Sequence, residues 1–410
     1  MLAAIAALYL AVVGVGAHPV ESRGMVLPTK WYRDANDGHP VHKLFARQSE
    51  FPQVGSPEWT KKYPAGKLSA ASNPQEWTDA LAAAKAAGKI PTDCPVASAG
   101  GTYRNSSGTI NPNSPQICSS AAQCRSPDQV YDVPDNIVAI SFDDGPQPAS
   151  KTLHEFCRQN NQKVTHFYIG GNIRDYPQLF MEAYSVNGDD MAVHTWSHQH
   201  TPQLTDDMVL AELGWTVQII FDSTGGRLPM YWRPPYGESD TRVRAIAYHV
   251  FGLKTVIWNN DTDDWKIGQG QTFAKASAVL TKAYTGKKSP GLNILEHELT
   301  EQTVKVFTDT YPMIAQNGWT GKSIPDALGS SWYLNAADNT SPVTPGRVAG
   351  GPGGSVAPPS PSGGNSSATD SASTVGPSAT AQPGSNGALS LIANSITIAL
   401  VTLLGSILVL

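Results

Sequence analysis

The sequence lacks any block of basic residues. Its 410 residues include 29 Lys and Arg against 34 Asp and Glu, which gives a formal net charge of −5 at pH 7. A nucleic-acid-binding protein gathers Lys and Arg on one face or along one helix, where they neutralise phosphates. The composition therefore argues against nucleic acid as a partner and favours a neutral or weakly charged substrate.

Charge is also absent from both ends of the chain. Residues 1–17 are apolar and end in Val15-Gly16-Ala17, whose small side chains predict a signal-peptide cleavage site. Residues 389–410 carry no charge and follow the small residues 385–388, the pattern of a glycosylphosphatidylinositol (GPI) attachment signal that is removed from the mature chain, with Asn386 or Ser385 as the attachment residue. The alternative is a transmembrane anchor, but no basic flank follows it. We expect a secreted protein that is GPI-anchored at the cell wall and the outer face of the plasma membrane.

Residues 336–388 have almost no charged or large apolar side chains. Between 341 and 388 only Arg347 and Asp370 are charged, and Ser, Pro, Gly, Thr and Ala dominate. This composition predicts a disordered, O-glycosylated stalk. Sequons predict N-glycosylation at Asn105, Asn339 and Asn365, whereas we expect the sequon at Asn260 to be bare because it lies beside candidate catalytic residues.

Cysteine is scarce, with four residues in the whole chain: Cys94, Cys118, Cys124 and Cys157. In an exported protein an even number of cysteines predicts disulfides rather than a metal site. We expect two disulfides, and the sequence leaves all three pairings open.

Residues 18–130 show no sustained periodicity apart from one helix. Asn73 is its expected cap, Pro74 its first residue, Glu76 the partner of a capping box, and Gly88 its end. We interpret this region as an irregular extension packed on a larger domain. The alternative is an independent carbohydrate-binding module built on its tryptophans, but no strand pattern supports one.

Short apolar runs alternate with longer amphipathic ones in residues 131–335. The runs predict strands at 137–142, 164–169, 191–194, 230–233, 253–258 and 292–297, and helices at 150–159, 205–221, 240–248, 272–284 and 301–317. Alternation of this kind predicts parallel βα units, in a barrel or in a doubly wound sheet. The number of units favours an α/β fold of the barrel type.

Two carboxylates, Asp143 and Asp144, end the first of these strands. Neighbouring aspartates repel, and a metal ion bound by one of them, with the other acting as a base, would compensate this repulsion. His194 and His198 follow the third strand, and histidines four apart meet on one face of a helical turn. Together with Asp144 they form a candidate set of three metal ligands with a position left open for water. The alternatives are a solvated turn and histidines buried in the core.

Three later strands also end in polar or aromatic residues. Arg233 precedes two prolines and offers a planar fork that suits a carboxylate such as Asp143. Trp258 ends the next strand and is followed by Asp264, and His297 closes the last one as a candidate general acid. The alternatives are a surface arginine, a core tryptophan and a buried imidazole.

These five stretches, in this order, resemble the polysaccharide deacetylases of carbohydrate esterase family four, and most closely the fungal chitin deacetylases. The resemblance covers about residues 130 to 330 and implies a distorted (β/α) barrel. It implies that Asp143 is the base, that Asp144, His194 and His198 bind one divalent metal ion, and that Arg233 holds Asp143 ionised. It further implies the following roles: Asp264 orients the acid His297, the backbone N–H of Tyr236 binds the oxyanion, and Trp258 and Leu295 line the acetyl pocket. Zinc is the expected ion, with cobalt or another divalent ion as the alternative.

The resemblance predicts an enzyme that removes N-acetyl groups from chitin at the cell wall and acts as a monomer. Two alternatives remain: a deacetylase of another acetylated wall polymer, such as peptidoglycan or xylan, and a wall protein that binds chitin without catalysis. The sequence departs from the family pattern at Ser141, where Thr is usual, and at Glu298, where Asp is usual. Neither position carries an expected role.

Overall fold

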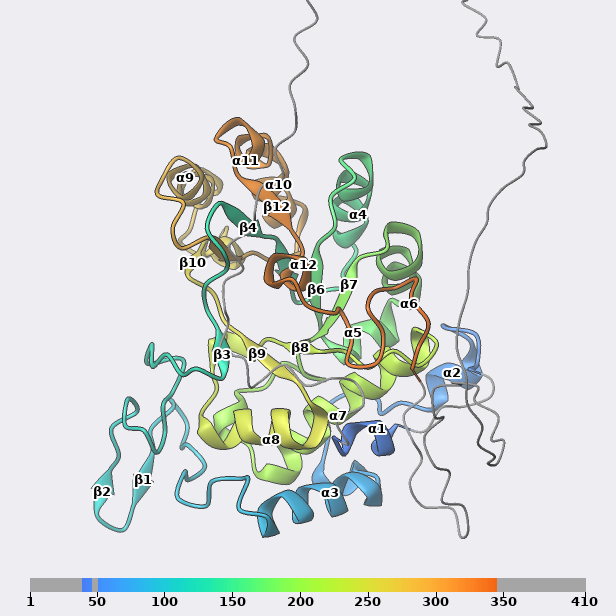
Figure 1. The fold of residues 1–410 in the computed structure, drawn as a ribbon, viewed down its shortest axis with the longest axis vertical. Coiled ribbons are helices and arrows are strands. Elements are labelled where there is room, and N and C mark those ends of the chain that lie inside the picture. The colour runs from blue at the N-terminus through green and yellow to red at the C-terminus, as the bar shows by residue number, and fades with distance from the viewer. Residues whose placement is uncertain (1–38, 46–50, 345–410) are drawn as a thin grey trace, which may run out of the picture. The chain divides into compact units, whose positions relative to one another are not determined.

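The computed structural model describes residues 39–45 and 51–344 (Figure 1). A parallel sheet of six strands, in the order β3-β9-β8-β7-β6-β5, forms one side of its strand layer. The strands are β3 (Gln129–Val130), β5 (Ser141–Asp143), β6 (Thr165–Tyr168), β7 (Asp190–Val193), β8 (Tyr231–Trp232) and β9 (Lys254–Val256). All residues of β5, β6 and β7 are buried, as expected for parallel strands covered on both faces.

A second parallel sheet has the order β10-β11-β4-β12. Its strands are β10 (Asn260–Asp261), β11 (Leu292–Leu295), β4 (Ile137–Ala139) and β12 (Thr320–Lys322). The strand predicted at 137–142 is thus two short strands, because the chain leaves one sheet at Ile140 and enters the other. A parallel bridge between Asp143 and His297 joins the two sheets at their carboxyl ends.

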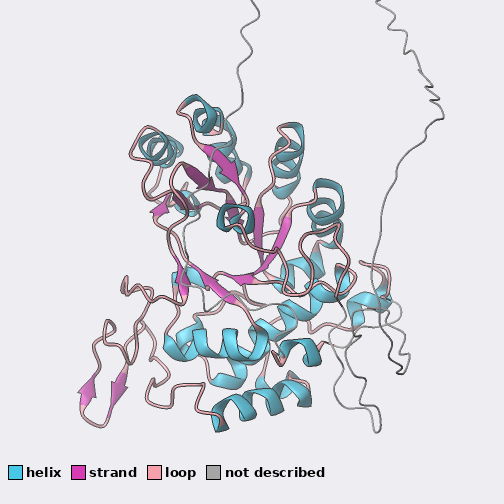
Figure 2. Cartoon of the chain, viewed as in Figure 1, coloured by secondary structure: helices cyan, strands magenta, loops and turns pink. Residues whose placement is uncertain are grey.

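Helices connect the parallel strands and lie outside them, while the strands curve into an incomplete barrel (Figure 2). The α-helices of this part are α4 (Ser150–Gln159), α5 (Gly170–Asp175), α6 (Pro177–Met181), α7 (Asp206–Ser223), α8 (Thr241–Phe251), α9 (Phe273–Tyr284), α10 (Glu301–Thr310), α11 (Pro312–Gln316) and α12 (Ile324–Leu328). Single turns of other helix types are η2 (Glu182–Asn187), η3 (Thr201–Gln203), η4 (Pro235–Gly237) and η5 (Asp264–Lys266). The predicted α/β fold of parallel βα units is confirmed.

Two helix predictions were wrong in detail. The helix predicted at 301–317 is α10 followed by α11, because Pro312 has no backbone N–H and begins a new helix. Helix α3 (Gln75–Ala86) begins after Pro74, which is its N-cap, so the expected capping box does not form. The Asn73 side chain donates instead to the carbonyl oxygen of Asp207 at 2.8 Å.

The N-terminal extension contributes α1 (Val41–Leu44), α2 (Pro57–Lys61), η1 (Ala70–Ser72) and α3, followed by the antiparallel hairpin of β1 (Arg104–Asn105) and β2 (Gly108–Thr109). Trp59 and Trp77 are buried in the same apolar cluster as the inner faces of α7 and α8. A β-carbon on Gly214 of α7 would lie 2.3 Å from the ring of Trp77. The absence of a side chain at Gly214 therefore provides the space into which Trp77 packs.

The structure contradicts the prediction of two disulfides. Cys118 and Cys124 form one disulfide, six residues apart in sequence. Cys94 and Cys157 are buried free thiols. Cys157 lies on α4 among the apolar side chains of one core cluster, and Cys94 lies in another beside Tyr103, so the barrel core separates them.

Across residues 39–45 and 51–344, no helix is both long enough and apolar enough to cross a membrane. The predicted signal peptide, most of the stalk and the attachment signal lie outside the described residues, as do Asn365 and Asn386.

Candidate active site

The carboxyl end of β5 delivers Asp143 into the interior of the molecule. Its side chain is 2% exposed, and its Oδ1 atom accepts a hydrogen bond from Nη1 of Arg233 at 2.7 Å. Arg233 follows β8 and is fully buried, and its second terminal nitrogen donates to Ser141 and Asn293 at 3.1 and 3.3 Å. In this charge-assisted hydrogen bond the buried carboxylate and the buried guanidinium each compensate the other's desolvation.

Asp144 faces two histidines that follow β7. Its Oδ1 atom lies 3.2 Å from Nε2 of both His194 and His198. One potential ligand atom from each of the three residues lies within 4.8 Å of the others. The Nδ1 atom of His194 is 2.7 Å from the carbonyl oxygen of Arg233, which fixes the proton on Nδ1 and turns the lone pair of Nε2 toward Asp144.

The donor set fits a divalent cation. Within the described part of the chain, Asp144 Oδ1 is buried and has no hydrogen-bond donor. Burial by itself raises the pKa of Asp144, but the proximity of His194, His297 and His198 lowers it overall, so the carboxyl is ionised. Burial, reinforced by His194, lowers the pKa of His198 to about 4, which leaves its imidazole neutral at pH 7. A carboxylate with two imidazoles is a ligand set that zinc and similar ions accept.

The loop that carries the histidines is not the helical turn that the four-residue spacing suggested. Thr195 and His198 have positive φ angles of 64° and 55°, so the chain bends sharply twice. Glu212 of α7 lies fully buried beneath the bend. Its carboxylate accepts hydrogen bonds at 2.6–2.8 Å from the backbone N–H groups of Trp196 and Ser197 and from the side chains of Ser197 and Gln199.

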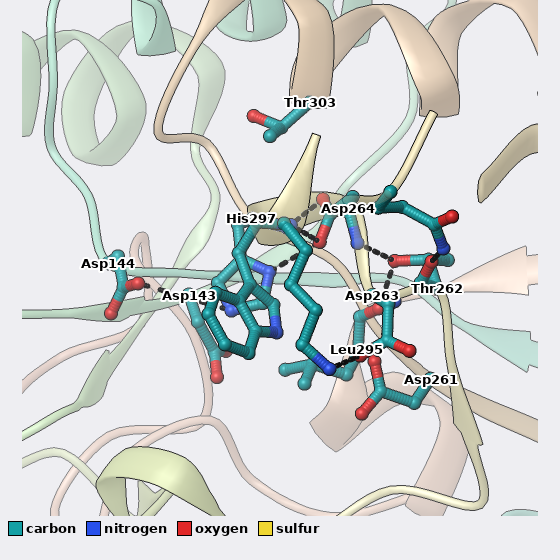
Figure 3. Close-up of polar contacts among 12 residues, drawn as sticks. Asp143, Asp144, Asp261, Thr262, Asp263, Asp264, Leu295, His297 and Thr303 are labelled. Carbon is teal, nitrogen blue, oxygen red and sulfur yellow. Dashed lines mark hydrogen bonds and ion pairs between the residues drawn. The ribbon is translucent and has the colours of Figure 1, made fainter. Parts of the chain in front are cut away.

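His297 lies opposite, between Asp264 and the two aspartates at the end of β5, Asp143 and Asp144 (Figure 3). Its Nδ1 atom is 2.6 Å from Oδ1 of Asp264, and its backbone N–H donates to Oδ2 of the same residue at 2.9 Å. Burial lowers the pKa of His297, but the fully buried carboxylate of Asp264 outweighs this effect and raises it to about 10. The imidazole is therefore protonated, and its Nε2 atom lies 4.0 Å from Oδ2 of Asp144.

A cavity of about 350 Å³ brings these groups together. Asp143, Asp144, both histidines and His297 line it, and Tyr236, Trp258, Leu295 and Trp265 form its wall. This volume lies at the lower end of the range for small-molecule sites. Tyr236 has a positive φ of 59°, and five of the nine non-glycine residues with positive φ in the described chain lie on its loops: Asp144, Thr195, His198, Tyr236 and Asp263. Strained backbone of this kind gathers at functional sites.

All ten predicted site residues of the barrel thus lie around one cavity, with Arg233 and Asp264 behind its surface as partners of Asp143 and His297. The sequence reasoning missed Glu212 and Asn293. Glu212 was hidden in the middle of a mainly apolar helix, where one acid between apolar residues suggests only an exposed position. Asn293, a polar residue within a buried strand, was the one detectable signal.

The glycosylation predictions have different outcomes. Asn105 is exposed on the β1–β2 hairpin, and Asn260 is half-buried. Nδ2 of Asn339 donates to the carbonyl oxygens of Tyr184 and Asp189 at 3.2 and 2.7 Å, and its Oδ1 accepts from Tyr333. Since a glycan is attached to Nδ2, this geometry conflicts with the prediction for Asn339.

The polysaccharide deacetylase family matches residues 131–256. Chitin deacetylase 3 of Cryptococcus neoformans var. neoformans serotype D is 41% identical over 334 residues, which cover 79% of this chain and 78% of that protein. The chain therefore belongs to the polysaccharide deacetylase family and is a hydrolase.

More distant proteins are also similar. Chitin deacetylase 1 of Saccharomyces cerevisiae is 36% identical over 199 residues, covering 48% of this chain and 63% of that protein. Among solved structures, the chitin deacetylase of Colletotrichum lindemuthianum matches with a TM-score of 0.46 and 20% identity, over 50% of this chain and 94% of that one.

Proposed function

We propose that this chain removes N-acetyl groups from the N-acetylglucosamine units of chitin and yields chitosan and acetate. One observation carries the proposal: a carboxylate paired with a buried arginine, a set of three metal ligands and a protonated histidine line a single cavity. Amide hydrolysis needs a strong nucleophile and a proton donor, because the carbonyl is a poor electrophile and the amine a poor leaving group. The names of the relatives with 41% and 36% identity supply the substrate.

Asp144, His194 and His198 would hold the metal ion, and zinc is the first candidate. When bound, such an ion polarises the carbonyl and lowers the pKa of water, in known cases from 15.7 to about 7. Asp143 is placed to act as the base. Its Oδ1 is held by Arg233, while its Oδ2 points into the site, 3.9 Å from Nε2 of His194. It accepts the proton of the water that attacks the acetyl carbonyl.

His297 is the acid on the opposite side of the cavity. Its Nδ1–H is directed at Asp264, so Nε2–H is the proton that faces the substrate. Transfer of this proton to the amide nitrogen allows the C–N bond to break, and the products are acetate and a free amine on the sugar. A positioned acid or base typically accelerates such a step by about 10²–10⁴-fold.

The wall of the cavity would bind the rest of the acetamido group. Trp258 and Leu295 offer an apolar surface to the methyl group. Tyr236, which lines the cavity and has a left-handed backbone, would donate its N–H to the oxyanion. Loss of one such donor costs about 2.7–4 kcal/mol in known cases.

We place the enzyme at the cell wall, outside the plasma membrane. The relationship to fungal chitin deacetylases supports the wall location. The GPI anchor at Asn386, the signal peptide and the glycans at Asn105 and Asn365 rest on sequence pattern alone.

Acetate release from N-acetylglucosamine oligomers, measured with and without a chelator, tests this function. We expect release that the chelator abolishes and added zinc or cobalt restores. Asp143→Asn should lose acetate release but keep its metal content, whereas His194→Ala should lose both. The proposal would be refuted if the metal-loaded protein released no acetate from any of three substrates: chitin oligomers, acetylated xylan and peptidoglycan. Full activity of Asp143→Asn would refute the base assignment.

A further inference from the structure

A second cavity of about 300 Å³ lies beside the active site, and His198 lines both. One wall consists of barrel residues that follow β6 and β7, including Asn172, Arg174 and Ser197. The other wall comes from the N-terminal extension, at Pro64, Gly66 and Lys67. We call this cavity the extension groove. Because β6 and β7 are parallel neighbours of β5, the groove opens at the same carboxyl edge as Asp143 and Asp144.

The extension wall is held in place by specific contacts. The indole N–H of Trp196 donates to the carbonyl oxygen of Gly66 at 3.2 Å. The ring of Tyr63 lies 6.4 Å from that of Trp196, and its hydroxyl donates to Asp222 of α7 at 3.0 Å. Leu68, directly after Lys67, is buried in the main core. The groove is therefore part of the folded barrel and does not depend on a loose segment.

The charged side chains of its lining are two cations, Lys67 and Arg174, and one carboxylate, Asp175, so cationic donors are in excess. Lys67 is exposed and has no ion-pair partner within residues 39–45 and 51–344. Nε of Arg174 is buried and has no acceptor in the same part of the chain, while its Nη1 lies 3.2 Å from Asp175. Asn172 connects the groove to the metal-ligand loop, since its Nδ2 donates to the carbonyl oxygen of Asp144 at 2.8 Å.

We propose that the extension groove is a subsite for a further N-acetylhexosamine unit of the polymer whose reacting acetamido group occupies the main cavity. This assignment rests on the proposed function. Sugar hydroxyls and an acetamido carbonyl are acceptors and match the donors of Lys67 and Arg174. A deacetylated unit carries an ammonium group when protonated, and Lys67 repels it. The subsite thus selects chains that are long enough to reach it and still acetylated at that unit.

Substrate length provides the test. Energy from a substrate unit remote from the reacting bond raises kcat/KM. Wild type should therefore hydrolyse the N-acetylglucosamine pentamer with a higher kcat/KM than the dimer. Lys67→Ala and Arg174→Ala should each lower kcat/KM for the pentamer about tenfold, the loss expected for one charge-assisted hydrogen bond, and leave the dimer within about twofold. Lys89→Ala, an exposed lysine of the extension outside the groove, is the matched control.

Three results would overturn the subsite: an unchanged pentamer value in Lys67→Ala, an equal loss for dimer and pentamer, or the same loss in Lys89→Ala. If wild type releases no acetate from either oligomer, the proposed function fails, and calorimetric titration with the pentamer then tests the groove directly. Weaker pentamer binding by Lys67→Ala would support the groove, and equal binding would reject it. If Lys67→Ala lost affinity only for a sulfated glycan, the groove would bind anions, and the proposal that it binds a neutral N-acetylhexosamine unit would be rejected.

Discussion

Glu212 allows a sharp test of how the metal-ligand loop is held. It accepts four hydrogen bonds from Trp196, Ser197 and Gln199 of the loop that carries His198, yet it does not line the active-site cavity. Glu212→Gln keeps the size of the side chain but replaces one acceptor oxygen with an NH₂ donor. That donor faces either the two backbone N–H groups or the side chains of Ser197 and Gln199, so two donors oppose each other in a buried space.

The expected magnitude follows from these contacts. Hydrogen bonds to a charged group contribute about 1.5–3 kcal/mol each, and Ser197 and Gln199 can rotate to recover part of the loss. We expect the free energy of unfolding to fall by about 2–3 kcal/mol. Because the loop positions His198, metal affinity should fall about 10–100-fold, as for other residues that orient metal ligands.

Competition with a chromophoric chelator measures the metal affinity, and denaturant unfolding measures the stability. Asp222→Asn is the matched control, since Asp222 lies on the same helix, is 3% exposed and bonds Tyr63 and Gln218 instead of the ligand loop. It should lose stability without losing metal affinity. Metal affinity of Glu212→Gln within twofold of wild type, or an equal loss in Asp222→Asn, would contradict the proposed support of His198.

Three further predictions concern stability and cysteine chemistry. Gly145→Ala should lower the free energy of unfolding by about 1–3 kcal/mol, because the new β-carbon would lie 2.4 Å from the buried side chain of Glu298; an unchanged denaturation midpoint would contradict this packing. Burial raises the pKa of Asp190 to about 8, so above pH 4 the folded state retains a proton that the unfolded chain releases, and stability falls as pH rises toward 8. In Asp190→Asn, the free energy of unfolding should fall less steeply with pH than in the wild type, by up to about 1.4 kcal/mol per pH unit. Parallel curves of stability against pH for the wild type and Asp190→Asn would refute this prediction. Thiol titration of denatured, unreduced protein should find two free thiols, those of Cys94 and Cys157. A result of no free thiol would show that these two cysteines form a second disulfide.

Periodicity predicted most of the barrel because strands such as β5, β6 and β7 are buried on both faces and therefore appear as short, mainly apolar runs. It could not place the break at Ile140, since the chain stays buried where it passes from one sheet to the other. Capping rules failed at Asn73 because helix α3 begins one residue later than expected, with Pro74 as its N-cap, and Nδ2 of Asn73 donates to the carbonyl oxygen of Asp207. The cysteines could not be paired from spacing, which gives no distance between elements.

The site was predictable to the extent that its residues follow strands. Parallel strands end at one edge, so Asp143, His194, Arg233 and His297 were expected to meet there although up to 154 residues separate them. The spacing of His194 and His198 suggested a helical turn, but the chain brings them together with two left-handed residues and the buried carboxylate of Glu212. Such support comes from side chains that pack only once the fold is complete.

The fit of Trp77 against Gly214 has a consequence for where this protein can be cut. The family match ends at residue 256, before Asp264 and His297, and begins after the whole extension. A chain that starts at residue 131 would leave a hole over Gly214 and expose the apolar face of α7, which now packs on the extension. We expect such a fragment to aggregate on expression, so the segment that the family match covers is smaller than the unit that folds.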